Sequence, residues 1–277
     1  MTTVNLTRPI RTDSAAGRLF PWEAPYRTEE IATLTYNGAN LFHITMGSGA
    51  ATRLIGPALS SPGGATVDQL TPEKLVNRPA TVVTCRPGED GRITAALVAD
   101  AFAEAGPAHG DAIVLATGWG DQPDRLDTDE YLLDGPHLDP EAATTLVELL
   151  AGNGSDLLLT DCGYLDRPGG EHARAEWTAL QPWLRPTFPS DAARTYLEHY
   201  RPEKVRRDWA ATIALTASIW TVVGLVGCAA LDGRRIRLTL APLPVQGVGE
   251  VPCTVVAQFV GDDGQPVTPV PLRGDPT

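Results

Sequence analysis

The pattern of apolar and polar positions along this chain predicts strands interleaved with helices. Short apolar runs are typical of strands that are covered on both faces, and they lie at residues 80–85, 111–117, 156–160 and 219–226. Two later segments, residues 235–240 and 254–260, alternate apolar and polar side chains, as strands with one solvent-facing side do. Together these segments predict a mixed β-sheet.

Helical periodicity marks the segments between these strands. Residues 93–105 carry it, and Gly106-Pro107 then gives a helix-ending signal. A second helix is predicted to begin at Asp139-Pro140-Glu141, where an N-cap, a first-turn proline and an acid follow one another. This helix should end near residues 152–154, and residues 171–184 and 191–200 are predicted to be helical as well.

A β-hairpin is predicted near the N-terminus. Residues 31–36 and 41–46 are strand-like, and Asn37-Gly38 between them is a strong signal for a two-residue turn. We expect residues 1–28 to form an N-terminal arm that packs on the body or on a partner subunit, and residues 29–277 to form one domain. The predicted fold class is α/β in layered α+β form, a single domain with a mixed β-sheet flanked by helices.

Composition narrows the possible partners. The 277 residues carry a formal net charge of -12, which argues against nucleic-acid binding because an acidic surface repels phosphate. We expect no membrane partner, since no apolar run is long enough to span a bilayer, and the first residues lack the apolar core of a secretory signal. The four cysteines are widely spaced, as in proteins with reduced thiols, so a cytoplasmic location is expected.

Four short motifs, in this order and spacing, resemble those of one family. They are LATGWGD at residues 115–121, HLDPEAA at 137–143, LTDCGYLD at 159–166 and APLPV at 241–245. The chain is similar here to the putative cyclase family that includes bacterial kynurenine formamidase. The resemblance covers most of residues 31–259 and implies a swivelling β/β/α cyclase-like fold. It also suggests a homo-oligomer, either a dimer or a tetramer.

The family's metal-binding motif, H-x-G-T-H-x-D-x-P-x-H, falls without a gap on residues 49–59 when Gly63-Gly64 and residues 67–70 are used as anchors. Thr52 and Pro57 are kept. The positions that supply metal ligands in the family hold other residues here, namely Gly49, Arg53, Ile55 and Leu59. The family's glutamate falls on Val223 and its catalytic histidine near Ala211. Because these side chains donate no lone pair to a divalent ion, we expect no metal and no other cofactor.

Four residues are candidate catalytic groups. Arg53 would stand where a metal ligand stands in the family, and a fixed cation there could stabilise an enolate or alkoxide; the alternative is a surface ion pair. Thr52 lies beside it on an otherwise apolar wall. Asp161 ends a predicted strand, where it could be a general base or could cap a turn. His43, on the predicted return strand, is a candidate acid or base.

Five further residues are candidates for substrate binding: Tyr36, Trp119, Tyr164, Ile55 and Leu59. Trp119 could form an aromatic wall, although a Trp at a strand end is equally typical of core packing. Cys162 shares a turn with Tyr164 but has no base beside it in sequence, so it is interpreted as a small buried residue.

The leading hypothesis is a metal-independent cyclase that closes rings by aldol-type condensation, or a related tailoring enzyme, in polyketide or other secondary metabolism. Its substrate would be small, hydrophobic and oxygenated. Ring closure of this kind needs enolate stabilisation and a shaped apolar pocket. Two alternatives remain: a non-catalytic binding or structural subunit, and an amide or lactone hydrolase of the kynurenine formamidase type.

Overall fold

The computed structural model of the protein describes residues 3–11, 26–122, 131, 134–166, 210–231 and 234–259. The predicted helices at residues 171–184 and 191–200 lie outside the described residues, as does most of the predicted N-terminal arm. Among the described residues, no helix combines the length and the apolar content needed to cross a bilayer.

The main sheet of the described chain has the strand order β1-β12-β11-β5-β7-β9-β10-β4, and β4 also pairs with β12. This last pairing closes the sheet into a barrel-like core, with β1 attached outside the closed ring. The strands are β1 Thr3–Asn5, β4 Arg53–Ile55, β5 Arg78–Thr84, β7 Ala112–Ala116, β9 Leu157–Thr160, β10 Trp220–Val223, β11 Arg235–Pro242 and β12 Glu250–Phe259. β5, β7, β9 and β10 are parallel neighbours, and the other pairings are antiparallel.

The two faces of the closed sheet bury different cores. One cluster, with Leu54, Val82 and Val222 in it, is enclosed by the strands. The other, with Ile55 and Val223, faces the helices. Because consecutive strand residues point to opposite faces, strands that are covered on both sides must be apolar throughout. This explains the continuous apolar runs from which the mixed sheet was predicted.

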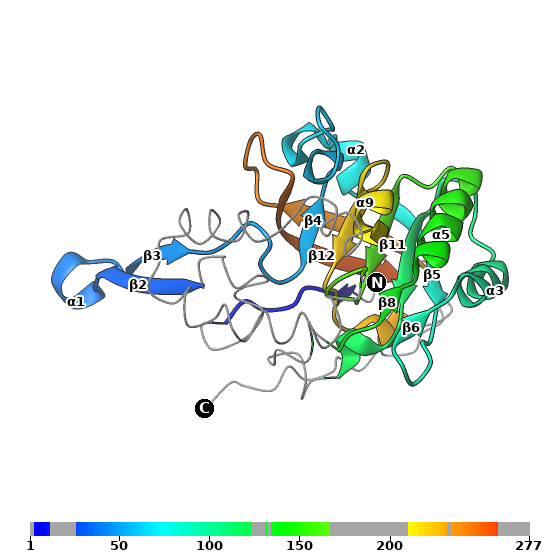
Figure 1. The fold of residues 1–277 in the computed structure, drawn as a ribbon. Helices are drawn as coiled ribbons and strands as arrows, with labels where there is room; N and C mark the ends of the chain where they lie inside the picture. Colours follow the sequence, from blue (N-terminus) through cyan, green and yellow to red (C-terminus); the bar gives the residue numbers. More distant parts are fainter. Residues whose placement is uncertain are drawn as a thin grey trace, which may run out of the picture.

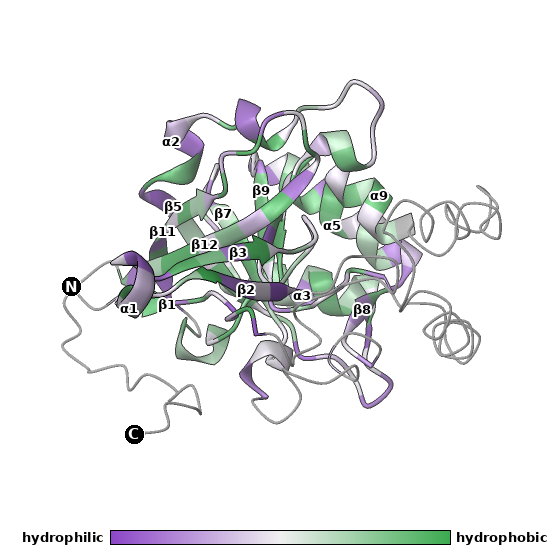
Figure 2. Ribbon diagram, turned by 90° about the vertical axis from the view of Figure 1, so that its left-hand side faces the viewer, coloured by the Kyte–Doolittle hydropathy of each residue, from purple (hydrophilic) through white to green (hydrophobic). Residues whose placement is uncertain are grey.

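Helices cover the outer face of the sheet. They are α3 Ala95–Ala105, α5 Pro140–Asn153 and α9 Ala210–Thr216, and α3 and α5 lie side by side (Figure 1). Their buried apolar residues pack against the sheet, and hydrophobic residues, green in Figure 2, are found along these helices. The start predicted for α5 is confirmed, because the Asp139 carboxylate accepts a hydrogen bond from Ala142 N at 2.7 Å. α5 ends at Gly154 in the left-handed conformation, with φ of 69°.

Short elements connect these layers. They are 3₁₀ turns at Pro57–Leu59, Val67–Gln69, Trp119–Asp121 and Cys228–Leu231, the short helix α2 Pro72–Leu75, and the two-stranded pair of β6 Arg92–Ile93 and β8 His137–Leu138. The predicted mixed α/β architecture with flanking helices is therefore confirmed.

The predicted hairpin exists, but its turn differs from the prediction. Its strands are β2 Arg27–Ala32 and β3 Leu41–Thr45, joined by the helical turn α1 Leu34–Asn37. The prediction of a strand over residues 31–36 with a two-residue turn was wrong, because Asn37 ends α1 and Gly38 is its left-handed cap. In Figure 1 the hairpin extends away from the closed sheet. Several of its large apolar side chains are exposed: Ile31, Leu34, Tyr36, Leu41, Phe42 and Ile44.

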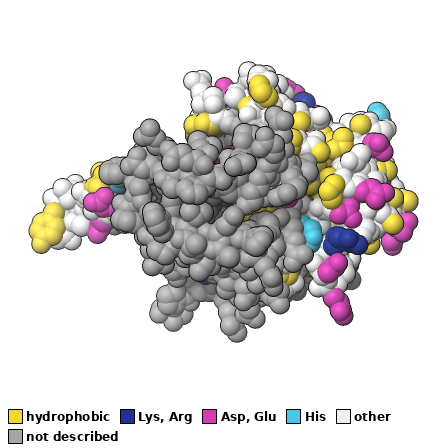
Figure 3. All heavy atoms as spheres, in the orientation of Figure 1, with side chains coloured by type: hydrophobic (Ala, Val, Ile, Leu, Met, Phe, Trp, Pro, Cys, Tyr) yellow, Lys and Arg dark blue, Asp and Glu magenta, His cyan; other side chains and the backbone are white. Residues whose placement is uncertain are grey.

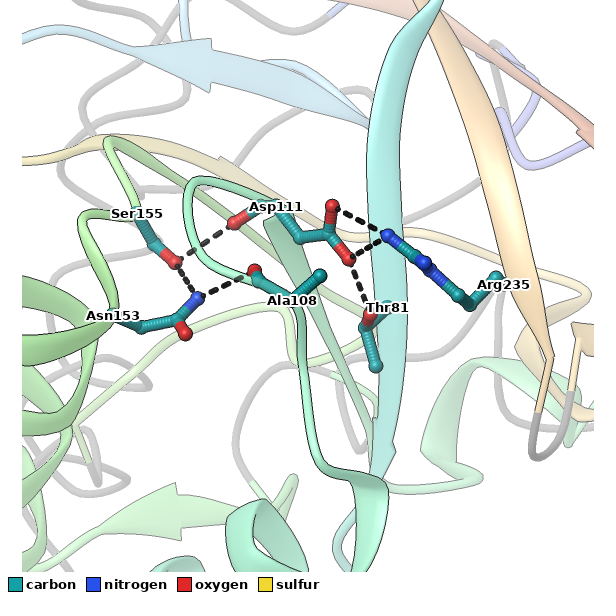
Figure 4. Close-up of polar contacts among 6 residues, drawn as sticks. All are labelled: Thr81, Ala108, Asp111, Asn153, Ser155 and Arg235. Atoms are coloured by element: carbon teal, nitrogen blue, oxygen red, sulfur yellow. Dashed lines mark hydrogen bonds and ion pairs between the residues drawn. The ribbon is translucent and has the colours of Figure 1, made fainter.

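A buried polar network joins the N-terminal ends of the parallel strands (Figure 4). The Asp111 carboxylate accepts hydrogen bonds from Thr81 Oγ1 at 2.7 Å and from Arg235 Nη2 at 3.0 and 3.2 Å. Ser155 Oγ donates to the Asp111 carbonyl oxygen at 2.7 Å and accepts from Asn153 Nδ2 at 2.9 Å. The network ties β5, β11 and the segments that enter β7 and β9 at the end of the sheet from which these strands start.

Replacing Asp111 by Ala should lower the free energy of unfolding by about 2–3 kcal/mol, because the buried Thr81 hydroxyl then loses its acceptor. Arg235→Ala is the matched control. Its side chain is 61% exposed whereas that of Asp111 is 4% exposed, so its loss should cost less than the loss of Asp111, about 1 kcal/mol. Urea unfolding of both variants measures the difference. Equal effects would show that the ion pair with Arg235, and not the hydrogen bond from Thr81, carries the stability.

Candidate functional site

A cavity of about 290 Å³ lies on the helix-facing side of the sheet, where β4 pairs with both β10 and β12. Strand register explains which side chains reach it. Arg53 is opposite Val223 of β10, and Ile55 is opposite Glu250 of β12, so these side chains share one face. Residues that follow β9 and residues of α9 complete the wall. The described lining residues are Arg53, Ile55, Leu59, Ser60, Tyr164, Leu165, Thr212, Ile213, Val223 and Glu250.

Arg53 is a buried cation at this cavity, with 5% of its surface exposed. Its Nε lies 3.2 Å from Glu250 Oε2, and its Nη2 donates to the Gly163 carbonyl oxygen at 3.4 Å. Its Cζ lies 5.8 Å from the centre of the Tyr164 ring, within range of a cation–π contact. Arg53 does form an ion pair, as the alternative expected, but this pair is enclosed at the cavity and does not lie on the surface.

Glu250 is a site residue that the sequence prediction missed. Its side chain is 13% exposed, and its Oε1 accepts a long hydrogen bond of 3.5 Å from Ser48 Oγ. The last strand was predicted to begin at residue 254, which left Glu250 in a loop, whereas β12 begins at Glu250. The useful signal was Arg53 itself, because a buried guanidinium requires a carboxylate partner.

Thr52 stabilises the backbone behind the cavity. It is 1% exposed, its hydroxyl donates to the Gly224 carbonyl oxygen and accepts from Arg8 N at 2.8 Å, and it is not among the lining residues. Gly224 has φ of 74°, and a Cβ there would lie 3.0 Å from the Ala51 carbonyl oxygen. The contact therefore fixes the end of β10 against the start of β4, which sets the position of Arg53.

Asp161 directly follows β9, and its carboxylate is surrounded by the turn that follows β7. Its carboxylate accepts hydrogen bonds from Thr117 N at 2.9 Å, Thr117 Oγ1 at 2.8 Å, Gly118 N at 2.8 Å and Gly120 N at 3.3 Å. It is fully buried, and burial raises the pKa of this carboxyl above its usual range despite these hydrogen bonds. Asp161 therefore caps a turn, as the second alternative expected. The turn that it caps follows the neighbouring strand β7, and not its own strand β9.

The aromatic candidates divide between the cavity and the core. Tyr164 lines the cavity. Trp119 is 8% exposed, donates from Nε1 to the Tyr131 carbonyl oxygen at 2.9 Å and stacks on the Tyr131 ring, so it packs in the core. Cys162, beside Tyr164, is buried, and burial followed by the Asp161 charge raises the pKa of its thiol. This makes Cys162 a poor nucleophile, as its interpretation as a small buried residue requires.

His43 and Tyr36 lie on the hairpin and outside the cavity of their own chain. Tyr36 is 89% exposed on α1, and His43 is on β3 opposite Glu29. Of the predicted site residues, the structure therefore brings Arg53, Ile55, Leu59 and Tyr164 together at one cavity. Thr52, Asp161, Trp119, His43 and Tyr36 are not among its described lining residues.

The donor set at the cavity does not fit a divalent metal ion. Within the described ranges, no group of three or more His, Cys, Asp and Glu side chains is placed to hold one. Two charged residues are found among the described lining residues, Arg53 and Glu250, and they are paired with each other. A guanidinium at this position would also repel a cation. Arg53, Ile55, Leu59 and Val223 nevertheless line one cavity, as expected if the family resemblance aligns them with metal-site positions.

The closed sheet with outer helices and a cavity at its closing strand defines a cyclase-like α/β domain. Similar solved structures include isatin hydrolase A from Labrenzia aggregata bound to benzyl benzoate, with 20% identity, a TM-score of 0.66, and coverage of 92% of this chain and 93% of that one. Isatin hydrolase A from Ralstonia solanacearum has 19% identity, a TM-score of 0.65 and coverage of 92% and 91%. A potential metal-dependent hydrolase with cyclase activity has 16% identity, a TM-score of 0.58 and coverage of 92% and 96%.

At these identities the likeness shows a shared fold. The sequence model of the family described as "Putative cyclase" matches residues 4–166, more than half of the chain. The protein therefore belongs to the putative cyclase family, and the predicted family resemblance is confirmed. Among curated proteins, none matches this sequence.

Purified protein is expected to contain no stoichiometric Zn²⁺ or Mn²⁺, and adding either ion in excess should leave its melting temperature unchanged. The reason is that an ion stabilises a protein only if it binds the native state. Elemental analysis after gel filtration, with a thermal melt in the presence of each ion, tests this. About one tightly held ion per chain would contradict the prediction and would favour metal-dependent hydrolysis.

Proposed function

We propose that this protein is a metal-independent cyclase that closes a ring in a small, hydrophobic, oxygen-bearing substrate by aldol-type condensation, within polyketide or other secondary-metabolite biosynthesis. The observation that carries this proposal is a buried guanidinium at an apolar cavity, at the position aligned with a metal ligand of the family. Arg53 provides this fixed positive charge, 3.2 Å from Glu250.

The chemistry of a guanidinium differs from that of a metal ion. A metal can convert bound water to hydroxide near neutral pH, whereas an arginine remains protonated and serves as a hydrogen-bond donor to a developing oxyanion. In a site shielded from water such donors can contribute several kcal/mol to the stability of a transition state. This role suits an enolate or alkoxide intermediate better than it suits the attack of water.

The walls of the cavity support an apolar substrate. Ile55, Leu165, Ile213 and Val223 provide much of the lining, and Tyr164 adds an aromatic face. The volume of about 290 Å³ is near the lower end of the range for small-molecule sites, roughly 300–1,000 Å³. The isatin hydrolase A from Labrenzia aggregata is bound to benzyl benzoate, an aromatic ester. This ligand is consistent with an apolar, oxygen-bearing substrate for the present chain.

Two alternatives to a cyclase have to be distinguished from it by experiment: a non-catalytic binding or structural subunit, and a hydrolase. An open cavity of ligand size favours ligand binding over a purely structural role. The names of several structural neighbours include hydrolase, which favours hydrolysis as the second candidate. The donor set, however, has no group of metal ligands among the described residues. A hydrolase at this cavity would have to activate water by other means.

Ring closure of 2,7-octanedione provides a test of the role of Arg53. Arg53→Met should slow enzyme-dependent formation of the five-membered ring about 100- to 1,000-fold, because one donor to the oxyanion is lost. Gas chromatography of the product measures the rate. Arg237→Met is the control, since Arg237 is exposed on β11. If the Arg53 variant kept the wild-type rate, the proposed role of this cation would be wrong.

We also propose that the protein is a homo-oligomer, a dimer or a tetramer, in which the hairpin packs on a second copy. An isolated two-stranded hairpin is marginally stable in water, and this one exposes Leu41, Phe42 and Ile44 by 53–55%. Contiguous exposed apolar side chains often mark protein interfaces. The hairpin projects from the body in Figure 1, which places it within reach of a neighbouring chain.

Replacing Phe42 and Ile44 together by Ser should shift the protein towards monomer, because both side chains would lie in the interface. Size-exclusion chromatography with light scattering measures the mass. Val76→Ser, at a residue 56% exposed outside the hairpin, is the matched control. A wild-type monomer at all concentrations would contradict the proposal, and so would a double variant with unchanged mass.

We propose a cytoplasmic location, with reduced thiols. Cys85, Cys162, Cys228 and Cys253 are buried and are not joined in disulfides. Burial raises the pKa of the Cys85 thiol to about 11 and that of Cys253 to about 12. At neutral pH these thiols are therefore protonated and unreactive.

A further inference from the structure

We infer that Glu250 is the catalytic base of this cavity and that it takes a proton from the carbon beside the carbonyl of an uncharged ketone whose oxygen is held by Arg53. This inference rests on the proposed function and adds to it a second catalytic residue and a substrate class. Glu250 is identified from the pairing of β12 with β4, and it lies outside the family motif aligned with residues 49–59.

The strand register places Glu250 and Arg53 at one cavity from two different strands. Glu250 begins β12 opposite Ile55, and Arg53 begins β4 opposite Val223. Their charged groups meet at 3.2 Å, and both line the cavity. A ligand in this cavity therefore contacts a donor and an acceptor that are already adjacent. This is the arrangement needed to hold a carbonyl oxygen and to accept a proton from the neighbouring carbon.

The Glu250 carboxylate retains capacity to accept a proton. Within the described part of the chain, Oε1 receives one hydrogen bond, the long contact of 3.5 Å from Ser48 Oγ, and Oε2 faces Arg53 Nε at 3.2 Å. Among the described residues, that Nε–H has no acceptor aligned for a hydrogen bond, although the two charges are close. The two groups therefore attract each other without saturating each other, and Arg53 keeps donor capacity for the carbonyl oxygen of a substrate in the cavity.

Charge balance favours a neutral substrate. Of the described lining residues, Arg53 carries one positive charge and Glu250 one negative charge, so the pair is neutral. A carboxylate or phosphate ligand would place a second anion beside Glu250 in a poorly solvated site, which is unfavourable. A ketone brings no charge of its own. The cavity should therefore select uncharged carbonyl compounds over anions of the same size.

The proposed steps balance without another reactant. Glu250 removes the α-proton, the C–H bond breaks, and its electron pair forms the C=C bond of an enolate whose negative oxygen is held by Arg53. The enolate carbon then attacks a second carbonyl of the same molecule, forming the ring C–C bond. The new alkoxide takes the proton back from Glu250 and becomes a hydroxyl group. The negative charge moves from carboxylate to substrate and returns, so the buried cation is always paired.

Hydrogen–deuterium exchange of 1-tetralone, a neutral aromatic ketone with a slowly exchanging α-position, isolates the first step. Wild-type protein in D₂O should accelerate deuterium incorporation at that position, as followed by proton NMR. Glu250→Gln should reduce the enzyme-dependent rate at least about 100-fold, the usual contribution of a general base. Glu104→Gln, at an exposed position on α3, is the matched control and should exchange as wild type does.

Glu250→Asp is a second variant, for the case that Glu250→Gln does not fold. It should fold because it keeps a negative charge beside Arg53. Its carboxylate is one carbon shorter, so exchange should fall at least about tenfold while the melting temperature stays close to that of wild type. Binding of 1-naphthoate, a matched anion, gives a second readout that a merely structural role would not produce. It should bind Glu250→Gln more tightly than wild type, because Arg53 is then available to the anion.

The outcomes separate this inference from the proposed function. If wild type closes 2,7-octanedione and exchanges 1-tetralone while Glu250→Gln or Glu250→Asp exchanges at the wild-type rate, another group is the base and the inference is overturned alone. If wild type closes the ring but does not exchange 1-tetralone, the inference is again overturned alone. If wild type does neither, both the inference and the proposed function are overturned. Tighter binding of 1-naphthoate to wild type than to Glu250→Gln would overturn the claimed preference for neutral substrates.

Discussion

The pairing of β4 with both β10 and β12 is the constraint on which the rest of this structure depends. β4 has only three residues, yet it closes the sheet and supplies two side chains to the cavity, Arg53 and Ile55. Leu54 between them points into the enclosed core. Because side chains alternate between the two faces of a strand, Leu54 packs in the core while Arg53 and Ile55 face the cavity. The contact between Thr52 and Gly224 then holds this strand in register.

A buried ion pair at such a closure has a cost as well as a use. Two charges removed from water regain stability only when their partners are well placed, and the Nε contact of Arg53 is close but poorly aligned. Hydrophobic residues at both positions could make the closure more stable. A polar pair at this point therefore favours a functional reason for keeping it, in line with the general observation that imperfectly satisfied polar groups often mark ligand sites.

Local signals in the sequence predicted the parts of the fold that local physics decides. The helix start at Asp139-Pro140 was correct because an N-cap acts over three residues. The position of the hairpin was also correct, but its turn was not, since the side chains of Asn37 and Asn40 accept hydrogen bonds from Thr33 N and Leu34 N and support a helical turn. Side-chain to backbone bonds of this kind compete with tight turns in a way that the Asn-Gly signal does not reveal.

The site was harder to predict because its contacts are remote in sequence. Arg53 and Glu250 are 197 residues apart in the sequence, and strand pairing brings them together. Asp161 was predicted as a possible base because it ends a strand, yet its hydrogen-bond donors belong to the turn after the parallel neighbour β7. His43 and Tyr36 lie on a hairpin whose direction no local pattern encodes.

The short closing strand also gives the molecule a natural seam. Regions held by few backbone contacts open locally at lower free energy than the whole fold, and β4 is attached through three residues on each side. Opening there would separate Arg53 from Glu250 while the parallel strands and their helices remain folded. A ligand that contacts both residues would bind the closed state and not the opened one. Occupancy of the cavity would therefore stabilise closure of the barrel.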